Sequence, residues 1–239
     1  MPKLFENPVF CALDTPRVDM ALSQAKNLSG LIGGVKLGLE FFLANGPASI
    51  KEMHKAGLPI FLDLKLHDIP NTVAGAVRSL ANLGVDIITI HTQGGPSMMR
   101  AAVDSANEEA AKLGLTPPKI IGVTILTSLD DGDLSKMGVN HSVEDQVLNL
   151  ASLAKASGLD GVVCSPLEIK AIRQELGQEF KLIVPGIRPE GASAGDQKRV
   201  LSPKQAVDAG ADILVIGRPI TKADDIKSAA ASIKTSLGL

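Results

Sequence analysis

The sequence predicts an α/β protein that forms one domain over residues 1–239, a (β/α)8 TIM barrel. Short apolar runs alternate with amphipathic stretches along the whole chain, which is the pattern of parallel strands joined by crossover helices. Eight such units in 239 residues suit this barrel, which typically takes ~250 residues. The runner-up, an open doubly wound sheet, would carry a glycine-rich fingerprint after its first strand. The sequence CALDTPR stands there instead.

Each expected strand is a short aliphatic run, and the expected strands cover residues 9–13, 34–37, 60–64, 87–90, 120–125, 161–164, 182–184 and 213–216. Helical patterns lie between them, at 49–56, 72–83, 98–113, 143–156, 166–176 and 203–209. Glycine stands where these helices are expected to stop, at positions 57, 84, 114, 158, 177 and 210. The connection at 186–201 is unusually long, and such loops are usually lids, binding loops or disordered segments.

The composition argues against several classes of partner. The formal net charge is −2 and there is no Trp or Tyr, so neither a basic nucleic-acid surface nor a base-stacking platform is expected. No apolar run is long enough to span a bilayer, and the first residues lack the apolar core of a signal peptide. The two cysteines lie in apolar runs and are expected to be free, buried thiols. We therefore expect a cytoplasmic protein that has no nucleic-acid or membrane partner.

The run DLKLHDIPNT, residues 63–72, contains the strongest functional signal. Alternation along a strand places Phe61, Asp63 and Lys65 on one face. A parallel strand that is buried on both faces is expected to be almost continuously hydrophobic, so two successive charges on one face need an explanation. Asp68 adds a third charge three residues later. The cluster predicts an active site at the end of this strand.

Polar residues also follow the other expected strands, at the end of a barrel where active sites form. They are Asp14, Lys36, His91, Thr127 with Ser128, Pro185-Gly186-Ile187-Arg188, and Gly217-Arg218. Each of these has an ordinary structural explanation when it is taken alone. Two lysines and three carboxylates at the same end of the first three strands favour a site. The Gly-Arg pairs after strands seven and eight favour phosphate binding, since barrels commonly bind phosphate there.

The charges restrict the chemistry. A lysine flanked by carboxylates keeps its proton, so Lys65 suits a general acid or a cationic stabiliser better than a Schiff-base nucleophile. Two carboxylates beside it form a negative pocket. A substrate carboxylate held there would be destabilised until it leaves as neutral CO2, and a nearby cation would stabilise the carbanion that remains.

The chain resembles the orotidine 5′-phosphate decarboxylase family along essentially its whole length. The resemblance rests on VFCALD, GVKLG, FLDLKLHDIPNT, VTILTS, DGVVCS, LIVPGIRPEG, GDQKR and VIGRPIT. It implies decarboxylation of orotidine 5′-phosphate to UMP in pyrimidine biosynthesis, with no metal and no organic cofactor. It also implies a homodimer in which Asp68 and Thr72 reach the neighbouring subunit's site.

The resemblance further implies residue roles. Lys65 is similar to the family's proton donor to C6 of the pyrimidine. Asp63 is similar to the carboxylate that faces the substrate carboxylate. Lys36 is similar to the lysine beside them in the charged network, which also contacts the ribose. The implied substrate-binding positions are Asp14 at the ribose, Ile69 and Thr72, Thr127 or Ser128 at the pyrimidine, Pro185, Gln197 in a closing lid, and Arg188, Gly217 and Arg218 at the phosphate.

Two alternatives stay open. A metal-dependent sugar-phosphate epimerase, lyase or aldolase on the same barrel could use Asp63, His67 and His91 as ligands, although two nearby lysines would repel the cation. Insensitivity to chelators would argue against it. The other alternative is a non-enzymatic nucleotide-binding barrel, which turnover of orotidine 5′-phosphate would eliminate.

Overall fold

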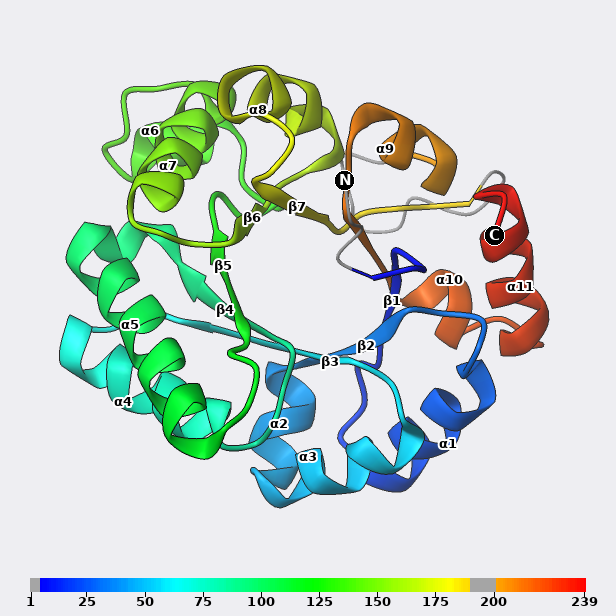
Figure 1. The fold of residues 1–239 in the computed structure, drawn as a ribbon. Helices are drawn as coiled ribbons and strands as arrows, with labels where there is room; N and C mark the ends of the chain where they lie inside the picture. The colour runs from blue at the N-terminus through cyan, green and yellow to red at the C-terminus, as the bar shows by residue number, and fades with distance from the viewer. Residues whose placement is uncertain (1–4, 190–200) are drawn as a thin grey trace.

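The computed structural model describes residues 5–189 and 201–239, in which eight parallel strands close into a barrel inside a ring of helices (Figure 1). The strands are β1 Val9–Ala12, β2 Gly34–Gly38, β3 Ile60–Leu66, β4 Ile87–His91, β5 Lys119–Val123, β6 Gly161–Val163, β7 Lys181–Val184 and β8 Ile213–Ile216. Each strand pairs with the next in sequence, and β8 closes on β1. The predicted (β/α)8 barrel is confirmed.

Helices follow the strands on the outside of the barrel (Figure 1). They are α1 Val18–Leu28, α2 Leu39–Asn45, α3 Ala48–Met53, α4 Pro70–Ala81, α5 Gly95–Leu113, α6 Asp131–Lys136, α7 Val143–Ala156, α8 Ile169–Leu176, α9 Pro203–Ala209, α10 Arg218–Thr221 and α11 Ile226–Ser236, with 3₁₀ turns η1 His54–Ala56, η2 Thr92–Gly94 and η3 Pro166–Glu168. The helices α1, α2, α6, α10 and α11 lie outside the ranges expected from sequence. In the described parts of the chain, no helix is both long and apolar enough to cross a bilayer.

The apolar core has two layers, and strand β3 contributes to both. Ile60, Leu62 and Leu64 belong to the layer between barrel and helices. Phe61 belongs to the barrel interior, with Phe10, Ala12, Ile87, Ile121, Ile183, Ile213 and Val215. Asp63 is the next residue on the inward face. The interior therefore changes from hydrophobic to charged as β3 approaches its carboxyl end, as the alternation predicted.

Two strands, β3 and β5, end two residues away from the expected boundary, and four others end one residue away. Strand β5 ends at Val123 rather than at residue 125, although Ile125 is buried. The apolar run continues because Ile125 forms part of a cavity wall. Strand β3 continues to Leu66, and its pairing with β4 shifts register between Leu62 and Leu66.

Candidate active site

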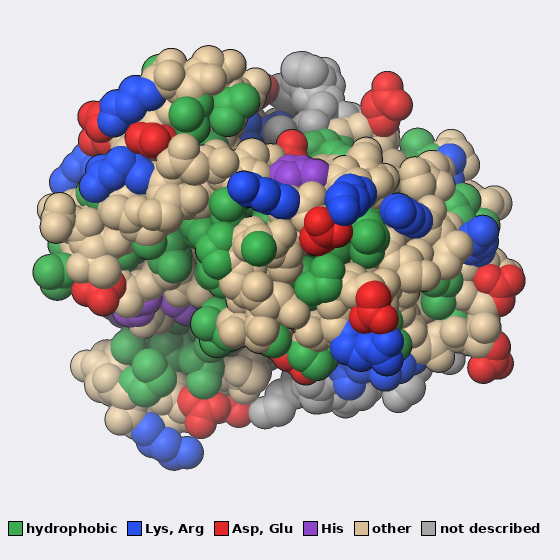
Figure 2. Space-filling view, turned by 90° about the horizontal axis from the view of Figure 1, so that it is seen from below, with side chains coloured by type: hydrophobic (Ala, Val, Ile, Leu, Met, Phe, Trp, Pro, Cys, Tyr) green, Lys and Arg blue, Asp and Glu red, His purple; other side chains and the backbone are tan. Residues whose placement is uncertain are grey.

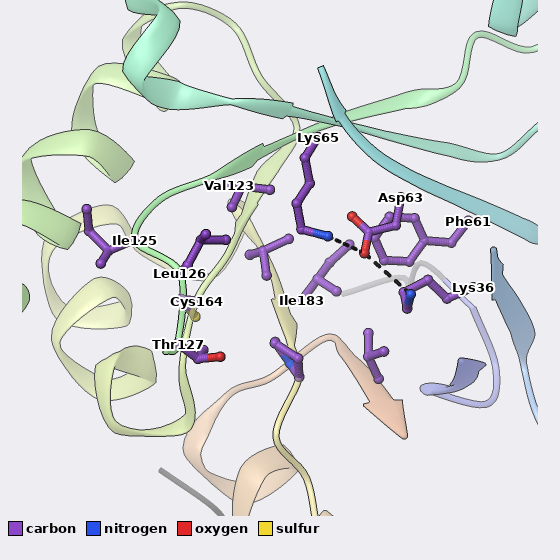
Figure 3. Close-up of a pocket in the computed structure, with 13 residues that line it drawn as sticks. Lys36, Phe61, Asp63, Lys65, Val123, Ile125, Leu126, Thr127, Cys164 and Ile183 are labelled. Atoms are coloured by element: carbon purple, nitrogen blue, oxygen red, sulfur yellow. Dashed lines mark hydrogen bonds and ion pairs between the residues drawn. The ribbon is translucent and has the colours of Figure 1, made fainter. Parts of the chain in front are cut away.

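A cavity of about 180 Å3 opens at the carboxyl end of the barrel, and its walls differ in chemistry (Figure 3). Its lining residues are Lys36, Phe61, Asp63, Lys65, Val123, Ile125, Leu126, Thr127, Val163, Cys164, Ile183, Pro185 and Val215. The charged groups come from β2 and β3, and Val123, Ile125, Leu126 and Cys164 lie across from them (Figure 3). A small ligand placed here would meet charge on one side and hydrocarbon on the other.

The charged wall is a chain of alternating charges. Lys65 Nζ donates to Asp63 Oδ2 at 2.7 Å, and Lys36 Nζ lies 3.5 Å from the same oxygen (Figure 3). Lys36 Nζ also lies 3.4 Å from Asp14 Oδ1. The order Asp14–Lys36–Asp63–Lys65 joins the ends of β1, β2 and β3. The structure thus brings together four residues that the sequence singled out.

Asp63 remains ionised although it is buried. Its side chain is 10% exposed. Burial by itself raises the pKa of Asp63, but the ammonium groups of Lys36 and Lys65 and the hydrogen bonds from Lys65 and Thr89 outweigh that effect, so the pKa lies below its usual value. The site therefore holds a carboxylate at neutral pH, close to the cavity.

The backbone of β3 is distorted where it presents these groups. Lys65 has φ +51°, and it is the single non-glycine residue with positive φ within residues 5–189 and 201–239. The Lys65 backbone N–H donates to Thr89 Oγ1 at 3.0 Å, and Thr89 Oγ1 donates to Asp63 Oδ1 at 2.9 Å. Thr89, on β4, thus contacts both members of the central pair.

The other expected substrate positions divide into two groups. Thr127 and Pro185 line the cavity, whereas Ser128 is exposed and does not line it. Gly217 packs near β1, where an added Cβ would lie 3.3 Å from the Ala12 Cβ and 3.8 Å from Asp14 Oδ2. This spacing places the end of β8 beside the outermost carboxylate of the chain of charges.

The arginines expected at the phosphate lie near the mouth of the barrel. Arg188 follows β7, and its guanidinium donates to the Ile187 carbonyl at 2.9 Å. Arg218 is exposed and is the first residue of α10, directly after Gly217. Gln197 lies outside the described residues.

Asp68, Ile69 and Thr72 do not line the cavity of their own chain. Asp68 is exposed and accepts a hydrogen bond from the Ile69 backbone N–H at 2.6 Å. Thr72 is exposed in the first turn of α4. The cluster of three charges expected from the DLKLHDIPNT run is therefore a cluster of two within one chain.

The His67 and His91 rings lie with their centroids 5.4 Å apart and their planes tilted by 39°, and neither residue lines the cavity. Burial, followed by the nearby charges of His67 and Lys65, lowers the pKa of His91 below its ordinary value, so His91 is neutral at pH 7. No three His, Cys, Asp or Glu side chains gather to hold a metal ion in the described residues.

Both cysteines are free and buried, as expected. Burial raises the pKa of the Cys11 thiol to about 12, and it also raises the pKa of Cys164, which lines the cavity. Both groups are therefore protonated thiols and contribute no charge to the site.

The sequence profile of the orotidine 5′-phosphate decarboxylase / HUMPS family matches residues 7–233. The chain belongs to this family. Among relatives of the family, the orotidine 5′-phosphate decarboxylase of Paramagnetospirillum magneticum is 55% identical over 98% of this chain and 99% of its own length. The corresponding protein of Rhodospirillum rubrum is 52% identical over 96% of this chain and 94% of its own length.

Solved structures of the family share the fold. The crystal structure of orotidine 5′-phosphate decarboxylase from Lactobacillus acidophilus has a TM-score of 0.84 and 39% identity, and covers 98% of this chain and 100% of that one. The structure from Pyrococcus horikoshii OT3 has a TM-score of 0.77 at 27% identity, and covers 97% and 99% of the two chains. The resemblance predicted from the motifs is confirmed along nearly the whole chain.

Sequence reasoning missed one polar residue of this family member's site, Thr89. A signal was present, because Ile87, Thr89 and His91 share the face of β4 that turns inward with Ile87. The sequence alone does not distinguish this threonine from an ordinary strand residue, because threonine is common in strands.

Proposed function

We propose that the chain is an orotidine 5′-phosphate decarboxylase, which converts orotidine 5′-phosphate to UMP and CO2 in pyrimidine biosynthesis. The observation that carries this proposal is the Lys36–Asp63–Lys65 array beside an apolar wall, in a chain that belongs to the decarboxylase family. The array supplies a fixed negative charge and a proton donor within one cavity.

The proposed reaction begins with the C6 carboxylate of the substrate beside Asp63. Two carboxylates at close range repel each other, and this repulsion ends when one of them leaves as neutral CO2. Val123, Ile125 and Leu126 supply an apolar surface for that neutral product. The C6–carboxyl bond breaks and its electron pair stays on C6.

Lys65 completes the proposed reaction. Its ammonium group is held 2.7 Å from Asp63, so it is a cation fixed close to the developing negative charge on C6. Lys65 Nζ then transfers one proton to C6 to give UMP, and solvent returns a proton to the amine. Asp63 supports this role, because its carboxylate accepts a hydrogen bond from Lys65 Nζ and holds the ammonium group at the cavity wall.

The remaining residues bind the rest of the substrate in this proposal. Asp14 and Lys36 hold the ribose, Thr127 contacts the pyrimidine, and Pro185 packs at the cavity wall. Thr127 is favoured over Ser128 because it is Thr127 that lines the cavity. Arg188, Gly217 and Arg218, with Gln197, bind the phosphate at the ends of strands seven and eight.

We also propose a homodimer in which Asp68 and Thr72 serve the partner's cavity, with Ile69 beside them. Its support is that Asp68 and Thr72 lie outside their own cavity and are exposed. Ile69 between them is 67% exposed, and a partner subunit would cover this apolar side chain. The cytoplasm is the proposed compartment, in keeping with two free thiols.

The competing proposal is metal-dependent chemistry on the same barrel. It requires ligands that gather around a cation, and Asp63, His67 and His91 do not form such a group in the described residues. Lys36 and Lys65 both face the Asp63 carboxylate, and they would compete with a metal ion for it. These positions favour the decarboxylase.

The test is turnover of orotidine 5′-phosphate by purified, chelator-treated protein in D2O. The proposal predicts loss of substrate absorbance and UMP with deuterium at C6, because the proton comes from an ammonium group that exchanges with solvent. Activity that disappears with the chelator and returns with a divalent cation would favour the metal-dependent alternative. No turnover under any condition would leave the non-enzymatic barrel.

A further inference from the structure

We propose that Thr89 is a positioning residue that holds Asp63 and Lys65 in their working arrangement. The inference rests on the proposed function and extends it to a residue that does not line the cavity but contacts two residues that do, Asp63 and Lys65. Thr89 is on β4, it is fully buried, and it does not line the cavity.

The two hydrogen bonds of Thr89 have fixed directions. The Asp63 carboxylate is ionised, so it can only accept, and the single hydroxyl proton of Thr89 therefore goes to Asp63 Oδ1 at 2.9 Å. A lone pair of the same hydroxyl takes the Lys65 backbone N–H at 3.0 Å. One oxygen atom thus ties the backbone of one catalytic residue to the side chain of the other.

This link lies at the point where β3 departs from regular pairing with β4. Leu62 pairs with Ile88, and the next pair is Leu66 with Ile90. Between these two pairs β3 advances by four residues while β4 advances by two, so β3 forms a bulge. Lys65 lies inside this bulge with φ +51°, a conformation that a lysine seldom adopts. The Thr89 hydroxyl accepts the N–H of this strained residue, which stabilises the bulge.

Because of this link, the two carboxylate oxygens of Asp63 have different partners. Oδ1 is occupied by Thr89, and Oδ2 faces Lys65 Nζ at 2.7 Å and Lys36 Nζ at 3.5 Å. Figure 3 shows the Lys65 and Asp63 side chains directed toward each other. Without the hydroxyl, Asp63 Oδ1 loses its hydrogen-bond donor, the carboxylate is held through Oδ2 alone, and the Lys65 backbone N–H loses its acceptor.

Three variants separate positioning from simple packing. Thr89→Val keeps the shape and removes the hydroxyl, and Thr89→Ser keeps the hydroxyl and removes a methyl group. Thr92→Val is the matched control, because Thr92 is equally buried and its hydroxyl donates to the Val123 carbonyl at 2.9 Å. It removes a buried threonine hydroxyl that does not touch the charged array.

The first readout is steady-state kinetics with orotidine 5′-phosphate. Because Thr89→Val loses a hydrogen bond to the charged Asp63 carboxylate, we expect kcat to fall ~10- to 100-fold. The Kd for UMP should change little. Thr89→Ser should recover most of kcat, and Thr92→Val should keep it. A folded Thr89→Val protein with wild-type kcat, or equal losses in the Val and Ser variants, would overturn the inference.

The second readout needs no turnover. The titration of the Asp63 carboxyl is followed by 13C NMR in all four proteins. The Thr89 hydroxyl stabilises the charged carboxylate, so its removal should raise the pKa of Asp63 in Thr89→Val and not in Thr89→Ser. Lys36, Lys65, Asp14 and His91 are the other charged or titratable groups around Asp63, and they are unchanged in every variant.

The two readouts distinguish the two levels of the proposal. A wild-type protein that does not turn over the substrate would contradict the proposed function, and the NMR titration would still decide whether Thr89 holds Asp63. An active wild-type protein whose Asp63 titrates identically with and without the hydroxyl would contradict the role of Thr89 alone.

Discussion

Asp63 keeps its charge because ammonium groups from two strands face one of its oxygens. Lys36 comes from β2 and Lys65 from β3 itself. Folding therefore gathers these charges in advance of substrate binding, so their repulsive and attractive forces are already present when the substrate arrives. Removal of either lysine should have effects on stability as well as on activity.

Lys36→Met is predicted to destabilise the protein in a pH-dependent way. The folded-state pKa of Asp63 is below its ordinary value, so its stabilising contribution is present above the unfolded pKa and is lost as pH falls through the folded pKa. Without Lys36, the free energy of unfolding should drop by ~1–3 kcal/mol at pH 7, because a buried carboxylate loses one of its two partners. The difference should shrink as pH falls below the ordinary pKa of an aspartate and through the lowered folded-state pKa of Asp63.

Urea unfolding of both proteins, followed over a series of acidic pH values as well as at pH 7, measures this effect. Lys119→Met is the control, since Lys119 pairs with Asp160 at 2.8 Å in a more exposed position and should cost less than ~1 kcal/mol. A Lys36→Met loss that stays constant over the whole acid titration would show that packing, not the charge on Asp63, is responsible.

Much of the residue-level site was predictable because strand alternation is a strict rule. Alternation of side chains along a strand predicted, from the sequence alone, that Phe61, Asp63 and Lys65 share one face. It could not predict the φ of Lys65, because the bulge depends on the register between β3 and β4. Thr127 and Ser128 could not be separated, because β5 ends before its apolar run does. Asp68 could not be placed, since it lies outside the cavity of its own chain.

At the scale of the elements, the two ends of the barrel perform different tasks. The carboxyl end holds the cavity. At the amino end, acidic side chains accept backbone N–H groups from neighbouring strands: Asp86 from Ile60, Asp160 from Ile120 and Asp212 from Leu182. Asp212 also pairs with the buried Arg173 and with Lys181. This end is built for stability.

Asp212→Asn should therefore destabilise the protein and spare catalysis. Loss of one partner from a buried ion pair costs ~3–5 kcal/mol, and Arg173, whose side chain is 6% exposed, would be left without its carboxylate. We expect a lower urea midpoint and a kcat close to wild type under conditions where the variant is folded. A folded variant with strongly reduced kcat would show that the two ends are coupled.

Arg218→Ala tests the phosphate loops at the other end. It should reduce kcat/KM for the phosphorylated substrate far more than for the bare nucleoside, which never makes the contact. The expected loss is ~2–5 kcal/mol if a desolvated charge pair is broken. Kinetics with both substrates measure it, and equal losses for the two would mean that Arg218 acts on the structure of α10 instead.

The whole molecule has a nearly balanced charge. The net charge is −2, and over α1, α2 and α3 basic and acidic side chains are interspersed among hydrophobic ones (Figure 2). No single sign dominates that face, so long-range attraction of a polyanion is not favoured there. The proposed partner is instead a second copy of the chain, which completes each cavity with Asp68 and Thr72.

Mixed dimers test this sharing of sites. Lys65→Ala and Asp68→Ala homodimers should each be nearly inactive. In a mixed dimer, one site receives Lys65 from one chain and Asp68 from the other and is intact, while the second site lacks both. Random exchange makes mixed dimers about half of the total, so roughly a quarter of the sites should recover. Verified mixed dimers without activity would contradict the shared site.

The most direct test of the proposed decarboxylation is turnover of orotidine 5′-phosphate by the Lys65→Met protein. Lys55→Met is the control, since Lys55 forms an exposed ion pair with Glu52. We predict that Lys65→Met folds, loses kcat by ~10³-fold or more because proton donor and cation disappear together, and that Lys55→Met matches the wild type. A folded Lys65→Met protein with near-wild-type kcat would contradict the proposed role of Lys65 and the decarboxylation mechanism with it.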